Sequence, residues 1–191
     1  VNAEFVRWGT RLACLEMALS GTTTYADMYY FEDVVAAATR EAGLRGVLGQ
    51  TILKFPSPDS KTPAEALAYA ERFIRKYRND SLIVPAPAPH ALYTNDDAVL
   101  KEARALANRF EVPLLIHVAE TELERGDAIR QGGASPVVLL DRLEMFQGRT
   151  VAAHAVWVDD ADLRLLHERG VGVAHCPSSN TKLASGVAPV V

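Results

Sequence analysis

The sequence contains little of what several classes of protein require. Its 191 residues include only two cysteines, Cys14 and Cys176, which are too few for a disulfide framework. No apolar run approaches the roughly 20 residues of a membrane-spanning helix, and the first residues lack the apolar core of a secretory signal. These absences favour a cytoplasmic protein with no membrane among its partners.

Clustered positive charge is also absent. The chain has 20 Lys and Arg against 24 Asp and Glu, a formal net charge of −4, and no basic block. A nucleic-acid surface would need the opposite balance, so we expect no nucleic-acid partner. No glycine-rich phosphate loop follows any predicted strand, which argues against nucleotide-binding doubly wound folds.

Apolar residues make up 49% of the chain, and they fall into strand and helix patterns that alternate without a tight hairpin. The predicted strands are 22–28, 45–53, 82–86, 114–118, 150–154 and 171–175. The predicted helices include 3–19, 33–42, 62–77, 136–143 and 159–169. This order indicates parallel strands with right-handed crossovers. The fold class is therefore α/β, and we favour a partial (β/α)8 TIM barrel with six of its eight strands present.

Two segments carry further expectations. The first helix has one apolar stripe, the pattern of a helix with one side toward a core: Phe5, Trp8, Leu12, Leu15 and Leu19. Residues 176–180 are expected to form a polar loop whose hydroxyl and amide groups bind substrate. The alternative is a turn satisfied by its own side chains.

Four of the five histidines lie at or just beyond the ends of predicted strands: His90, His117, His154 and His175. Parallel barrels build their sites at those strand ends. A neutral imidazole such as that of His117 can bind a metal, and Glu120, three residues later, can shuttle protons. The alternative is a core histidine, with Glu120 as a charge near the start of the next helix.

Other side chains near this face are given smaller roles. Glu122 is interpreted as a solvated charge of a first helical turn, and Asp27 as a helix cap rather than a partner of a metal ligand. Cys176 has no acid or second thiol nearby in the sequence, so a nucleophilic role is not expected. Lys54 is the only strand-end lysine that would suit a metal-free barrel enzyme of the aldolase kind.

The motifs in this order resemble those of the amidohydrolase superfamily, in particular the branch of methylthioadenosine/S-adenosylhomocysteine deaminases and chlorohydrolases. The similarity covers nearly the whole chain. One departure is Leu92, where the family's Pro-His-Ala-Pro-Tyr motif has a second proline. The segments that carry the resemblance are Ser20–Thr24, Pro89–Thr94, Ile116–Glu122, Ala153–Trp157 and Cys176–Gly186.

The resemblance implies a metal-dependent hydrolase of carbon–nitrogen bonds other than peptide bonds. It would deaminate a purine-like or other heterocyclic amine through a hydroxide held by one divalent metal, Zn or Fe. His117 is implied as a metal ligand, and Glu120 and His154 as catalytic residues. Alternatives on the same scaffold are a chlorohydrolase, a cyclic amide hydrolase or a non-catalytic binding homologue.

Substrate contacts are implied for His90, Ser178 and Asn180 of a small-molecule site. The family's His-x-His ligand pair and its aspartate ligand lie outside residues 1–191, so we expect one barrel domain truncated at both ends and inactive alone. Gln50 stands near the position of an arginine in many adenosine-type deaminases, which weakens a nucleoside assignment. Family members are often dimers, which makes a homo-oligomer a possible partner state.

Overall fold

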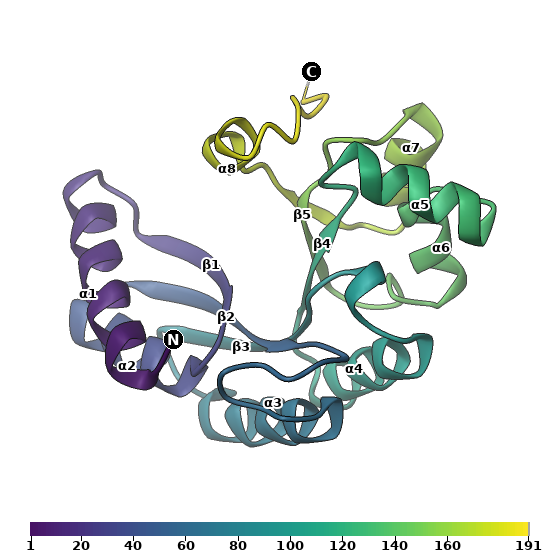
Figure 1. The fold of residues 1–191 in the computed structure, drawn as a ribbon. Helices are drawn as coiled ribbons and strands as arrows, with labels where there is room; N and C mark the ends of the chain where they lie inside the picture. The colour runs from purple at the N-terminus through teal and green to yellow at the C-terminus, as the bar shows by residue number, and fades with distance from the viewer. Residues whose placement is uncertain (191) are drawn as a thin grey trace.

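The computed structural model describes residues 1–190, and its strands follow an open arc with helices along the outer side (Figure 1). All strand pairs are parallel. The strands are β1 (Thr24–Tyr29), β2 (Arg45–Ile52), β3 (Ile83–Pro89), β4 (Leu114–Val118), β5 (Thr150–His154) and β6 (Gly172–Ala174). The helices are α1 (Ala3–Leu19), α2 (Glu32–Ala42), α3 (Pro63–Tyr77), α4 (Asp97–Phe110), α5 (Glu122–Gly132), α6 (Pro136–Arg142), α7 (Asp160–Glu168) and α8 (Pro177–Lys182), with a short 3₁₀ turn η1 (Leu92–Thr94).

The prediction of a partial TIM barrel is confirmed, with one refinement. The strands form two sheets of three, in the orders β1-β2-β3 and β4-β5-β6. A single bridge between Ala91 and His117 connects them, and there the His117 N–H donates to the His90 carbonyl oxygen at 2.9 Å. The strand order therefore follows the chain order, as it does in a βα barrel.

Three prolines in β3 explain why the sheet divides there. The N–H of His90 donates to Ile52 of β2, so alternate residues of β3 direct their N–H groups toward β2. Pro85, Pro87 and Pro89 occupy the other set of positions, on the edge that faces β4. Because proline has no N–H, that edge lacks the donors of a regular ladder.

The arc has a packed outer layer and a sparser inner one. Leu114 and Ile116 of β4 are fully buried against the helices in the largest apolar cluster. Leu115 points to the other face and packs with Ala86 and Ala88 in a small cluster. Since side chains alternate along a strand, His117 shares the inner face with Leu115. Small alanines on neighbouring strands leave room there for functional side chains.

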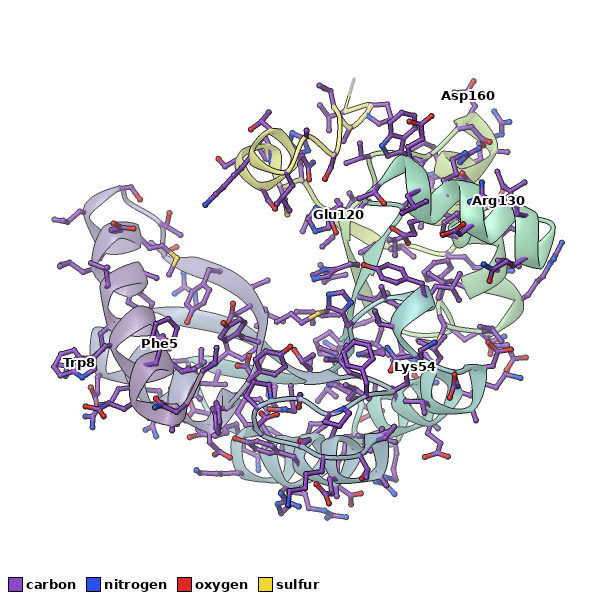
Figure 2. All side chains as sticks on the ribbon, viewed as in Figure 1. Phe5, Trp8, Lys54, Glu120, Arg130 and Asp160 are labelled. Atoms are coloured by element: carbon purple, nitrogen blue, oxygen red, sulfur yellow. The ribbon has the colours of Figure 1, made fainter. Side chains whose placement is uncertain are left out.

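The apolar stripe of α1 is exposed in the described chain. The expectation that this side of the helix faces a core is therefore wrong for residues 1–190. The five residues of the stripe are between 57% and 80% exposed, and Figure 2 shows Trp8 projecting away from the neighbouring elements. Val6 and Cys14 on another side of α1 are buried instead. Periodicity identifies an apolar side of a helix, but it does not show that residues 1–190 contain the surface that covers it.

The segment after β6 also differs from its prediction. Residues 176–180 do not form a loop, because α8 begins at Pro177. Proline suits the first helical position, where its missing N–H is not needed. The prediction overlooked this signal, although it used the same one correctly for α3, where Thr62 caps the helix ahead of Pro63.

None of the helices in residues 1–190 is long and apolar enough to cross a membrane.

A pair of phenylalanines tests the packing of the outer layer. Phe73 of α3 is fully buried, whereas Phe55 in the loop after β2 is 48% exposed. Phe73→Ala should lower the free energy of unfolding by about 3–5 kcal/mol, because it leaves a cavity. Phe55→Ala should cost less than about 1 kcal/mol. Urea unfolding measures both, and equal losses would contradict the core described here.

Candidate active site

Three imidazoles form a row at the ends of consecutive strands. His90 follows β3, His117 lies in β4 and His154 ends β5. The ring centroids of His90 and His117 are 4.8 Å apart, and those of His117 and His154 are 5.1 Å apart, with both pairs edge to face. The structure thus brings together three of the four strand-end histidines. His175 is exposed after β6 and makes no such ring contact with the described residues.

The central histidine of the row is held in its neutral form. Burial lowers the pKa of His117 to about 3, and the nearby His90 and His154 rings add to the effect. Its Nδ1 atom is buried and has no hydrogen-bond partner within residues 1–190. A neutral imidazole with an unused nitrogen is the form that binds metal ions.

The two outer histidines are each oriented by a neighbouring side chain. His90 Nδ1 lies 3.1 Å from the Thr94 hydroxyl, and burial lowers the pKa of His90. His154 Nδ1 lies 2.8 Å from the Asn180 amide oxygen. An amide oxygen only accepts, so this contact suits a His154 ring that donates from Nδ1. The Nε2 atom of His154 is then directed toward the carboxylate of Glu120.

Glu120 lies beside this row, in the turn between β4 and α5, and faces the opening of the arc (Figure 2). Its Oε1 atom is 3.7 Å from His154 Nε2. The turns around both residues contain left-handed backbone: φ is +50° at Ala119, +78° at His154 and +47° at Ala155. Such conformations are uncommon for residues with a Cβ atom and concentrate at functional sites.

Sequence reasoning missed Glu124, which lies in the first turn of α5. Its two carboxylate oxygens accept the N–H groups of Ala119, at 3.0 Å, and Glu120, at 2.8 Å. The Thr121 hydroxyl accepts the N–H of Glu124. The sequence pattern Thr-x-x-Glu at 121–124 is that of a helix capping box and was the available signal. Glu122, which the sequence analysis considered instead, is exposed.

Asp27 and Gln50 lie apart from the imidazole row. Asp27 shares a small cavity with Val6 and Tyr25, on the face of β1 that is turned to α1. Burial raises the pKa of Asp27 to about 6. Gln50 is fully buried and donates to Asp59 in the loop after β2. Both side chains therefore lie in the outer layer, away from the imidazole row, in the described part of the chain.

The two α8 residues predicted to contact substrate have different environments. Asn180 is buried, next to His154, and its Nδ2 atom has no partner among the described residues. Ser178 is exposed on the same helix. A cavity of about 590 Å³ lies outside the row and is lined in part by Lys54, Tyr93 and Glu124.

The donor set supplies only part of a metal site. Within residues 1–190, no group of three or more His, Cys, Asp or Glu side chains is placed to hold a metal ion. A catalytic zinc is held by about three protein ligands. The chemistry of His117 fits one of these positions, because its ring is neutral and one nitrogen is unpaired.

Parallel strands in chain order, with imidazoles and a carboxylate at their C-terminal ends, are the arrangement in which βα barrels build their sites. The model of the family described as "Amidohydrolase family" matches residues 1–191, and the chain belongs to that family. The resemblance noted in the sequence is thereby confirmed.

Curated relatives agree on a narrower branch. The chain is 45% identical over 190 residues to a 5-methylthioadenosine/S-adenosylhomocysteine deaminase of Thermodesulfovibrio yellowstonii, covering 100% of this chain and 43% of the relative. It is 47% identical over 185 residues to a 5'-deoxyadenosine deaminase of Methanothrix thermoacetophila, with 97% and 43% covered. The chain thus spans less than half the length of these relatives.

Solved structures show the same fold. An adenosine deaminase from Xanthomonas campestris with bound zinc is 41% identical and superposes with a TM-score of 0.95, over 99% of this chain and 43% of that one. An atrazine chlorohydrolase from Arthrobacter aurescens, complexed with zinc, is 20% identical with a TM-score of 0.88, over 100% and 46%. At that identity the second likeness shows the fold alone.

The raised pKa of Asp27 predicts a pH-dependent stability. Between the ordinary value of 3.8 and about 6, the folded chain holds a proton on Asp27 that the unfolded chain has released. This group therefore makes the folded state less stable as the pH rises through that window. Asp27→Asn should remove the effect and be more stable than the wild type at pH 7. Urea unfolding at pH 4 and pH 7 measures it, and a variant less stable than wild type at pH 7 would contradict this account.

Proposed function

We propose that this protein is a metal-dependent aminohydrolase that removes an amino group from a purine-like heterocycle. The observation that carries the proposal is the approach of Glu120 Oε1 to His154 Nε2, at 3.7 Å, beside the neutral ring of His117. The relatives named as deaminases of adenosine-type compounds support this substrate class. Because the chain spans under half of their length, the proposal concerns the complete gene product.

His117 would hold the metal together with ligands from outside residues 1–190. Zinc suits an imidazole ligand, and the zinc-bound adenosine deaminase structure, at 41% identity, supports that choice. When bound, a divalent metal supplies an acidified water at neutral pH and polarises the group under attack. The buried setting of His117 favours this role, since it keeps the ring unprotonated over the working pH range.

Glu120 is proposed to move the proton of the reaction. A carboxylate that takes a proton from the attacking water can hand it to the departing nitrogen, so that ammonia leaves as a neutral molecule. His154, whose Nδ1 atom lies 2.8 Å from the Asn180 amide oxygen, presents its Nε2 atom 3.7 Å from Glu120 Oε1. It is therefore placed to orient the water that Glu120 deprotonates.

Substrate contacts are proposed for His90, Asn180 and Ser178. His90 is fixed by Thr94, and its ring packs edge to face against Tyr93 at 6.1 Å. The unpartnered Nδ2 atom of Asn180 offers a donor beside His154. Exposed Ser178 would contact a more distant part of a bound molecule.

The proposal also covers the cellular location and the assembly of the protein. Both cysteines are free thiols, which suits a reducing cytoplasm. A homo-oligomer is proposed from the resemblance alone. We propose that the described residues form one barrel domain together with the parts of the gene product that supply the remaining metal ligands.

The role of Glu120 is tested by Glu120→Gln in the complete gene product. The amide keeps the size of the side chain but does not accept and release the proton, so turnover should fall by at least about 100-fold. Zinc content should stay at the wild-type level. Ammonia release and metal analysis measure the two quantities. Glu122→Gln, an exposed change of the same chemistry on α5, is the matched control and should keep wild-type turnover.

The assay also separates the alternative reactions. Candidate substrates are a purine nucleoside with an exocyclic amine, a chlorinated triazine and a cyclic amide. Ammonia, chloride or a ring-opened product then identifies the reaction. Release of chloride or a ring-opened product without ammonia would contradict the deaminase proposal, and so would full turnover by Glu120→Gln.

A further inference from the structure

The turn that carries Glu120 is hydrogen-bonded from one side by α5. Glu124 Oε1 accepts the Ala119 N–H at 3.0 Å, and Glu124 Oε2 accepts the Glu120 N–H at 2.8 Å. Glu124 is buried at the wall of the cavity described above, and its carboxylate makes both bonds charge-assisted. The Thr121 hydroxyl in turn accepts the Glu124 N–H at 3.1 Å and fixes the start of the helix.

The same turn is hydrogen-bonded from the other side by the segment that follows His154. The carbonyl oxygen of Ala119 accepts the N–H groups of Val156, at 3.0 Å, and Trp157, at 2.9 Å. The carbonyl oxygen of Val118 accepts the Ala155 N–H at 3.0 Å. The backbone next to Glu120 and the backbone next to His154 are therefore directly connected.

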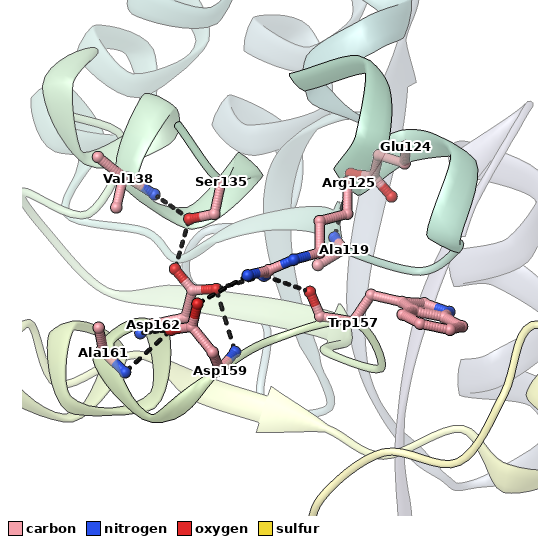
Figure 3. Close-up of polar contacts among 9 residues, drawn as sticks. All are labelled: Ala119, Glu124, Arg125, Ser135, Val138, Trp157, Asp159, Ala161 and Asp162. Atoms are coloured by element: carbon pink, nitrogen blue, oxygen red, sulfur yellow. Dashed lines mark hydrogen bonds and ion pairs between the residues drawn. The ribbon is translucent and has the colours of Figure 1, made fainter. Parts of the chain in front are cut away.

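Arg125, the neighbour of Glu124, holds the segment after His154 through its guanidinium group (Figure 3). One nitrogen, Nη1, donates to the Trp157 carbonyl oxygen at 2.8 Å and to Asp162 Oδ2 at 2.8 Å. The other, Nη2, donates to Asp159 Oδ2 at 2.7 Å. Asp162 is buried and also accepts from the Ser135 hydroxyl, so the anchor on α7 is itself fixed.

We propose that Glu124 and Arg125 are positioning residues that together set the separation of Glu120 and His154. This inference rests on the proposed function, in which those two side chains act together. Both turns contain left-handed backbone at Ala119 and His154, which persists only where surrounding bonds determine it. Two consecutive residues of α5 supply those bonds, one to each turn, so α5 fixes both turns against a single rigid element.

The first test is Glu124→Gln in the zinc-loaded complete gene product. Glutamine has the same shape but one acceptor oxygen, so one of the two N–H groups at residues 119 and 120 loses its partner. Hydrogen exchange in peptides that cover residues 114–124 should become about 10-fold faster. The kcat for ammonia release should fall about 10- to 100-fold, the loss typical of residues that orient a metal-site group. KM and zinc content should change less than about twofold.

Arg125→Lys tests the bonds that hold the segment after His154. A lysine ammonium cannot replace the planar fork that joins Trp157, Asp159 and Asp162. Exchange should become faster in peptides that cover residues 155–158, and kcat should fall with little change in KM. The matched controls are Glu122→Gln and Arg130→Lys. Glu122 is exposed, and Arg130 pairs with Asp127 on the solvent side of α5, so both controls should match the wild type.

Two outcomes would overturn the inference. One is unchanged exchange at residues 119 and 120 in Glu124→Gln; the other is a kcat loss no greater than that of Glu122→Gln. If Glu124→Gln does not fold, Arg125→Lys decides by the same readouts. If the wild-type protein releases no ammonia from any substrate, the proposed function fails, and hydrogen exchange alone then decides whether α5 holds the two turns.

Discussion

The hydrogen bond from the His117 N–H to the His90 carbonyl oxygen joins the two halves of this chain. Prolines on the facing edge of β3 remove the other donors of a regular ladder, so this bridge is the ladder contact between the two sheets in the described residues, beside the side-chain packing of Leu115 on Ala86 and Ala88. It also fixes the relation of two imidazoles, because His90 and His117 form it. The ring contact at 4.8 Å follows from that backbone contact.

A second constraint acts on the other side of His117. Regular parallel pairing between β4 and β5 ends with Val118 opposite His154. After that pair, both strands turn through residues with left-handed backbone. Backbone bonds from Ala155, Val156 and Trp157 continue the contact beyond the last ladder pair. The face that carries the imidazole row is therefore built from backbone hydrogen bonds first. The side chains of Glu120 and His154 take their positions from them.

Much of the fold could be predicted from the sequence, because local patterns determine it. Apolar runs and breaker residues located all six strands, and the absence of hairpins indicated parallel pairing. The strand-end rule predicts four histidines on one face, and the structure brings His90, His117 and His154 together there while His175 lies outside the row. These inferences succeed because each depends on a few neighbouring residues.

Two of the differences depend on partners distant in sequence, whereas Glu124 and the start of α8 carried local signals that were not used. The stripe of α1 is apolar, but no local pattern shows what covers it. The division of the sheet depends on which edge of β3 carries the prolines, and that is fixed only by pairing with β2. Glu124 was missed because its importance lies in two backbone N–H groups rather than in a motif of reactive side chains.

The central claim is that His117 binds the metal beside a carboxylate and a second imidazole. The most direct test is the zinc content of the complete gene product and of its His117→Ala variant, both purified with equal zinc supplied. The account predicts about one zinc per wild-type chain and a large loss in the variant, because a catalytic site keeps few protein ligands. A variant that retains the wild-type zinc content would contradict it.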